Sequence, residues 1–64
     1  MRHAGGDRAA EARRKAIFRL LVLGHDHAMS VAESRAMVRD RFGVSDDAVR
    51  RIEREGIAGG WPPL

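Results

Sequence analysis

The stretch RFGVSDDAVRRIE at residues 41–53 decides how this chain folds. A segment without glycine or proline leads up to Gly43, and glycine just past a helix supplies the left-handed residue that commonly ends it. Ser45 then stands where an N-cap is needed. Asp46 and Asp47 follow in the first turn, where the helix dipole favours negative charge. The stretch therefore predicts two helices joined by a three- to four-residue turn that contains glycine.

The segment before the turn carries its own start signal. Residues 30–33 read SVAE, the spacing of a capping box, in which the serine hydroxyl accepts from the third helical amide and the glutamate reaches back. This signal predicts a helix that begins after Ser30 and ends at about Phe42.

The segment after the turn has an apolar side at helical spacing. Val49 and Ile52 lie three residues apart, so both fall on one face of a helix. We expect this helix to cover residues 46–55 and to end at Gly56.

A further helix is predicted over residues 8–23. This segment contains no glycine or proline, and Ile17 and Leu21 belong to an apolar stripe at three- and four-residue spacing. Asp7 is the expected N-cap, and Gly24 is expected to end the helix. Because no segment shows the period of two that strands require, the predicted fold is an all-α three-helix domain.

The chain divides into three parts. Residues 1–6, with two glycines and no periodicity, are expected to form a flexible arm, and residues 7–56 the three-helix domain. Residues 57–64 form an extended tail, and we expect Trp61 in this tail to pack on the domain, because a small core has few large apolar groups. The alternative is that the tail is a rigid segment offered to a partner.

Size and composition exclude several classes of protein. The chain has 64 residues, of which 33% are charged, and it has no cysteine. Folding would bury only about 60% of the surface of so short a chain, so a deep substrate pocket is not expected, and neither is enzyme activity. The first residues lack the apolar region of a signal peptide, and the longest apolar run is far shorter than a membrane span. We therefore expect a soluble, cytoplasmic protein that does not bind membranes.

The histidines offer one metal-like cluster, His25-Asp26-His27. Alternating residues in a loop do not preset a tetrahedral site, and a fourth ligand is not evident. We expect no bound metal and no cofactor, and we interpret these residues as polar loop residues.

The stretch at residues 41–53 resembles the helix-turn-helix of region four of bacterial sigma factors and of related small regulators. The similarity is carried by Phe-Gly-Val-Ser before a helix and by Val-Arg-Arg-Ile-Glu at residues 49–53, and it covers residues 30–56 at most. It implies a small, non-catalytic, sequence-specific DNA-binding module associated with bacterial transcription. Its partner would be double-stranded DNA, and a homodimer or a larger protein complex would add the contacts that one unit lacks.

The chain departs from the pattern of that family at two places. Arg39 stands four residues before the turn glycine, where the family usually has a small residue because the helices cross closely. Asp46 and Asp47 open the recognition helix, where basic or polar groups are usual, although a carboxylate can accept from a cytosine amino group.

The resemblance and the charge pattern together predict the site residues. Three arginines share the outward arc of the last helix, opposite its apolar side, and are the residues expected to contact DNA, together with two residues at the start of that helix: Arg50, Arg51, Arg54, Ser45 and Asp47. Residues 1–23 carry a net charge of +4, and three arginines there are candidate phosphate contacts: Arg13, Arg14 and Arg19.

Two alternatives remain open at this stage. Arg50 and Arg54 would pair with acidic neighbours such as Asp46, Asp47 and Glu53 on a solvated face, with no role in DNA binding. Separately, the small core, the acidic start of the last helix and the basic first helix are also typical of a helical protein-interaction module or a small subunit of a larger assembly.

Overall fold

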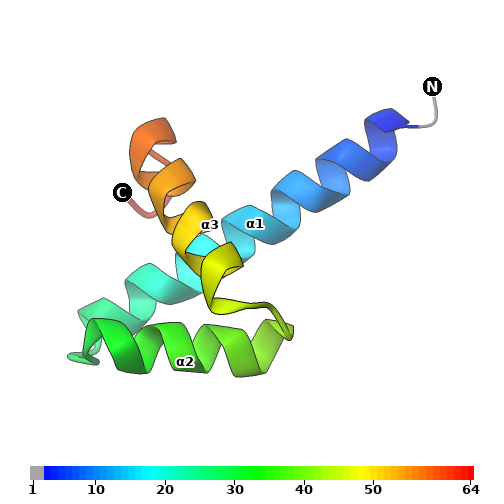
Figure 1. Ribbon diagram of the computed structural model, residues 1–64. Coiled ribbons are helices and arrows are strands. Elements are labelled where there is room, and N and C mark those ends of the chain that lie inside the picture. The colour runs from blue at the N-terminus through cyan, green and yellow to red at the C-terminus, as the bar shows by residue number, and fades with distance from the viewer. Residues whose placement is uncertain (1–2) are drawn as a thin grey trace.

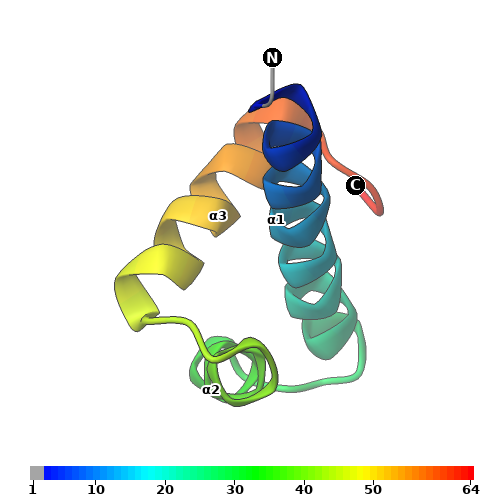
Figure 2. The same ribbon diagram turned by 90° about the vertical axis from the view of Figure 1, so that its right-hand side faces the viewer.

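The computed structural model describes residues 3–64, with side chains from residue 8 onward. Within that range it contains three helices and no strand: α1 (His3–Asp26), α2 (Val31–Phe42) and α3 (Asp46–Gly59). In Figure 1, α3 crosses the middle of α1, while α2 lies beneath the C-terminal half of α1. Figure 2 shows α1 and α3 alongside each other with α2 seen end-on below them. The predicted all-α three-helix domain is confirmed.

One small apolar core lies between the three helices. All three contribute to it, and its six members are no more than 6% exposed: Ile17, Phe18, Leu21, Val38, Val49 and Ile52. Phe42 and Val44, on either side of the turn glycine, are partly buried against this core. The turn is therefore held by packing from both sides as well as by its backbone.

The connection between α2 and α3 has the predicted local chemistry. Gly43 adopts φ 65° and ψ 38°, and its N–H donates to the carbonyl of Arg39 at 2.8 Å. Ser45 is the N-cap of α3, because its hydroxyl oxygen accepts from the Ala48 N–H at 3.1 Å. The left-handed conformation explains why glycine stands at this turn.

The start of α2 is also as predicted. The Ser30 hydroxyl oxygen accepts from the Glu33 N–H at 3.0 Å, and the Glu33 carboxylate accepts from the Ser30 N–H at 2.8 Å. Both halves of the capping box are therefore present.

Gly24 and Gly56 do not end helices, contrary to the sequence prediction. Both are buried inside a helix, Gly24 two residues before the end of α1 and Gly56 three residues before the end of α3. A Cβ on Gly24 would lie 2.9 Å from the Cβ of Ser34 in α2, and a Cβ on Gly56 would overlap the ring of Phe18. These glycines therefore allow close helix crossings, which requires no positive φ.

α1 is also longer at its start than predicted. Residues 1–2 of the expected arm lie outside the described residues, but residues 3–6 are helical and Asp7 lies within α1 rather than at its N-cap. Adding a residue to an existing helix forms one hydrogen bond without a new nucleus, and a glycine there costs only about 1 kcal/mol relative to alanine. The packed half of α1 therefore supports a further stretch that projects past the other two helices (Figure 1).

The C-terminal segment differs from an extended tail. Residues 57–59 belong to α3, and the Leu64 N–H donates to the Trp61 carbonyl at 2.9 Å, which closes a turn. Trp61 is partly buried against the core, with its ring edge-on to Phe18 at a centroid distance of 6.0 Å and an angle of 85°. The ammonium of Lys15 lies 5.6 Å from the Trp61 ring centroid, within range of a cation–π attraction. Trp61 thus packs against Phe18 at the edge of the core.

Candidate nucleic-acid interface

The outer side of α3 gathers the predicted arginines because its inner side is anchored. Val49 and Ile52 are buried at 0% and 6% exposure. With 3.6 residues per turn, the side chains of Arg50, Arg51 and Arg54 then emerge on the solvent side, and all three are exposed. The fold therefore fixes the direction of this face without using any of its charged groups.

Four of the five predicted DNA-contacting residues line one open depression of about 390 Å³: Asp47, Arg50, Arg51 and Arg54. The structure therefore brings these residues together at a single place. Among the side chains that the structure describes, Arg51, Arg54 and Asp47 make no ion pair, so two guanidinium groups in this depression remain available to a ligand. The fifth predicted residue, Ser45, caps α3 and does not line the depression.

Arg50 belongs to a bridge of three charged residues, Arg39, Asp46 and Arg50, which joins α2 to the start of α3. The Asp46 carboxylate accepts from Nη1 of Arg39 at 2.7 Å and from Nε of Arg50 at 2.8 Å. The Arg39 hydrogen bond is the largest cause of a lowered pKa at Asp46. The Arg50 hydrogen bond and the charges of both arginines add to it, while desolvation opposes it. Asp46 is therefore a carboxylate at neutral pH, and the alternative prediction that Arg50 pairs with Asp46 is confirmed.

Arg39 belongs to this bridge but was not among the site residues predicted from the sequence. The signal was present in the two departures from the sigma-factor pattern, a basic residue at 39 and an acidic residue at 46. These two positions have opposite charges and lie on the two helices that meet at the turn, and the structure joins them at 2.7 Å. The basic residue at position 39 and the acidic residue at position 46 therefore neutralise each other's charge.

The candidate phosphate contacts on α1 lie at three different places, and only Arg14 comes beside the arginine face, where it lines a depression of about 240 Å³ together with Arg51 of α3. Arg13 donates through Nη2 to the carbonyl of Phe42 at 2.7 Å, at the C-terminal end of α2. Arg14 makes two hydrogen bonds to the Glu55 carboxylate, at 2.9 and 3.3 Å. Arg19 is exposed and lines a separate depression between α1 and the end of α2, which contains no residue of α3.

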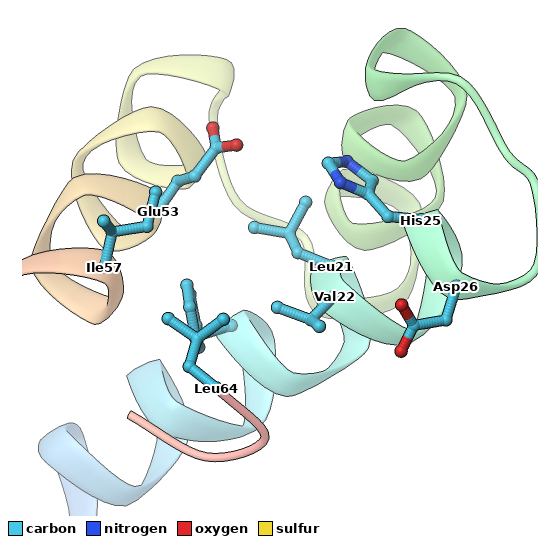
Figure 3. Close-up of a pocket in the computed structure, with 8 residues that line it drawn as sticks. Leu21, Val22, His25, Asp26, Glu53, Ile57 and Leu64 are labelled. Carbon is cyan, nitrogen blue, oxygen red and sulfur yellow. The ribbon is translucent and has the colours of Figure 1, made fainter. Parts of the chain in front are cut away.

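A second depression lies between α1 and α3 and is lined mainly by apolar side chains. Figure 3 shows it, and its volume is about 230 Å³. Its lining residues are Phe18, Leu21, Val22, His25, Asp26, Glu53, Ile57 and Leu64. Ile57 and Leu64 are 62% and 64% exposed, so this groove leaves two large apolar side chains in contact with water. Sequence analysis gave no indication of it, because the groove depends on how α1 and α3 cross.

The histidine cluster does not lie in a loop, as the sequence predicted: His25 and Asp26 belong to the last turn of α1, and only His27 lies in the turn that follows. In the part of the chain with described side chains, no group of three or more histidines, cysteines or carboxylates is arranged to hold a metal ion. None of the described helices combines the length and the apolar character needed to cross a bilayer.

Comparison with known proteins adds no relative. No protein family, curated protein or solved structure matches this chain.

Proposed function

We propose that this chain is a small, non-catalytic module that binds double-stranded DNA through the outer side of α3 and acts in bacterial transcription. One observation carries the proposal: Arg50, Arg51 and Arg54 surround a single open depression on the side of α3 opposite its buried anchors. The resemblance of residues 30–56 to region four of bacterial sigma factors supports it.

The charge balance of this face favours an anionic ligand. Four arginines lie on it or beside it, and two carboxylates, Asp46 and Asp47, offset half of their charge. The net charge of +2 is concentrated at Arg51 and Arg54, which no described carboxylate neutralises. Guanidinium groups pair with guanine edges or phosphates through two parallel hydrogen bonds, which suits this pair of residues.

The size of the face limits what one copy can achieve. Single DNA-binding modules bury about 600–1,000 Å² of protein surface, and one short helix supplies few base contacts. We therefore propose that a homodimer or a larger protein complex provides the remaining contacts.

The test is the salt dependence of binding to duplex DNA of mixed sequence. Affinity should fall steeply as salt rises, because each phosphate contact releases counterions. Arg51→Ala or Arg54→Ala should weaken binding by about 1–3 kcal/mol at one preferred base pair if the arginine reads a base. If it contacts a phosphate, the same change should lower the salt slope by about one.

Arg19→Ala is the matched control, because it removes the same charge from a depression that contains no residue of α3. The control should change affinity less than either substitution on α3. Equal losses from all three variants would show that only net charge matters and would remove α3 from the proposal.

The groove between α1 and α3 favours the second candidate, a protein-interaction module. Of its exposed side chains, Ile57 lies in the last turn of α3, at the opposite end from Asp47, and Leu64 lies in the segment that follows α3. Absence of DNA binding near physiological salt, together with loss of a protein complex in Ile57→Asp, would select this function over the first.

A further inference from the structure

We propose that Asp46 positions Arg39 and Arg50 as a two-arginine site for one backbone phosphate of duplex DNA. The proposal rests on the DNA-binding function proposed above and adds two residues to it, Arg39 as a phosphate contact and Asp46 as a positioning residue.

The bridge leaves most of the hydrogen-bonding capacity of both arginines unused. A guanidinium group has five N–H donors, and Arg39 and Arg50 each donate one to Asp46 in this structure. Their side chains are 40% and 55% exposed, so a ligand can reach both arginines from solvent. Two cations held by one carboxylate keep a net charge of +1, which attracts a singly charged phosphodiester.

The bridge is also continuous with the arginine face. Arg50 belongs both to the bridge and to the depression lined by Arg51 and Arg54. A DNA backbone held at Arg39 and Arg50 would therefore lie beside the residues expected to contact bases. This arrangement matches the usual division in which phosphate contacts position a protein and base contacts give sequence preference.

Two opposing effects decide the sign of a substitution at Asp46. Removing the carboxylate removes repulsion toward phosphate, and an exposed charge interaction of this kind changes an affinity by about two- to fivefold. The asparagine also presents an N–H donor where one arginine found an acceptor, and it leaves the other arginine only a neutral acceptor; ordering one released side chain on binding weakens affinity by about two- to tenfold. Because one arginine loses its hydrogen bond and the other loses its ion pair, the loss of order outweighs the removed repulsion, and Asp46→Asn should weaken DNA binding.

Asp47→Asn provides a matched control one residue away. It makes the same change of charge at the start of the same helix, but Asp47 makes no ion pair with any described residue. Asp47→Asn removes the repulsion without releasing an arginine, and it keeps an acceptor oxygen for a base contact, so it should tighten binding by about two- to fivefold. The two neighbouring substitutions should therefore act in opposite directions.

The experiment measures the affinity of the full chain and its variants for one mixed-sequence duplex by fluorescence anisotropy at fixed salt. Asp46→Asn should weaken binding at least about twofold, while Asp47→Asn tightens it. In an Arg39→Ala background one arm of the bridge is absent, so the effect of Asp46→Asn should shrink or reverse. Circular dichroism at the assay temperature establishes that each variant is folded.

A second measurement does not depend on any variant at Asp46. Single methylphosphonate substitutions along the duplex each remove one phosphate charge, and one position should weaken wild-type binding most. In Arg39→Ala that position should lose its special effect and fall to within about twofold of its neighbours.

The outcomes separate the two proposals. If both asparagine variants tighten binding equally, and the methylphosphonate profile is the same in wild type and Arg39→Ala, the bridge has no role and DNA binding stands. If wild type fails to bind duplex DNA even at low salt, the proposed function fails, and the phosphate site fails with it.

Discussion

The inner side of α3 is buried and closely packed, whereas the outer side of the same helix is exposed and charged. On the inner side Val49, Ile52 and Gly56 are buried, and the backbone at Gly56 is in direct contact with the Phe18 ring. On the outer side Arg51 and Arg54 are exposed and make no ion pair with a described residue. We therefore expect stability to depend on how closely α3 packs against α1, and substitutions on the outer side to change binding more than stability.

The largest loss of stability should come from removing the tryptophan that packs against the core. Truncation after Gly60 removes Trp61, which lies edge-on against Phe18. We expect unfolding free energy to fall by about 2–4 kcal/mol, close to the range for loss of a large aromatic group from a core. Urea unfolding followed by circular dichroism measures this, and an unchanged midpoint would mean that Trp61 adds nothing to the fold.

The second largest loss of stability should come from adding a single methyl group to the inner side of α3, at Gly56. In an ordinary helix interior, Gly→Ala stabilises by up to about 1 kcal/mol. At Gly56 the added Cβ would overlap the Phe18 ring, so Gly56→Ala should instead destabilise by about 1–3 kcal/mol. The thermal midpoint of the variant gives the sign directly. Partial recovery in the double variant Gly56→Ala/Phe18→Leu would identify the ring as the cause.

Removing a helix cap should have an intermediate effect on stability. Ser30→Ala and Ser45→Ala each remove a side-chain acceptor for a helical N–H, and each should cost about 0.5–2 kcal/mol. Chemical denaturation of both variants measures the loss, and Ser→Thr at the same positions, which retains the hydroxyl, should recover most of it. No loss at either position would contradict the helix starts described here.

The outer side should tolerate change almost without effect on stability. Arg54→Ala removes an exposed side chain that has no ion-pair partner among the described residues, so unfolding free energy should change by no more than about 0.5 kcal/mol. Duplex DNA affinity of the same protein should fall. A variant that unfolds as much as Gly56→Ala would remove the distinction between the two sides.

Acid should produce the smallest change, at the bridge. The hydrogen bond from Arg39 is the main cause that lowers the pKa of Asp46 below its ordinary value of 3.8. The bridge therefore contributes stability above about pH 3.8, and that contribution is lost as pH falls through the lower pKa of the folded state. Comparing thermal midpoints of wild type and Asp46→Asn between pH 2 and pH 6 tests this, because the two curves should converge at the acid end.

Local signals were sufficient for part of the fold. Both serine caps and the conformation of Gly43 are determined by neighbours within a few residues, so the sequence contains the information directly. Gly24 and Gly56 carry the same local signal as Gly43. Their roles depend on Ser34 and Phe18, which are distant in sequence, and a residue type alone does not distinguish a glycine that ends a helix from one that lets two helices touch.

The candidate site likewise has one part that the sequence predicts and another part that it does not. Helical periodicity is sufficient to place Arg50, Arg51 and Arg54 together, because all three lie on one helix. Periodicity within one helix could not show that Arg14 would pair with Glu55, 41 residues away. The net charge of a segment therefore overstates how many of its cations are free to bind a ligand.

The two acidic residues on the flanks of α3 have one more consequence. Glu53 accepts from Arg35 of α2 at 2.7 Å, while Glu55 accepts from Arg14 of α1 on another side of the helix. These tethers resist rotation of α3 about its long axis in either direction, and neither uses a residue of the outer arginine face. We therefore expect the rotation of α3 about its axis to stay the same when Arg51 and Arg54 are replaced, because both ion pairs remain.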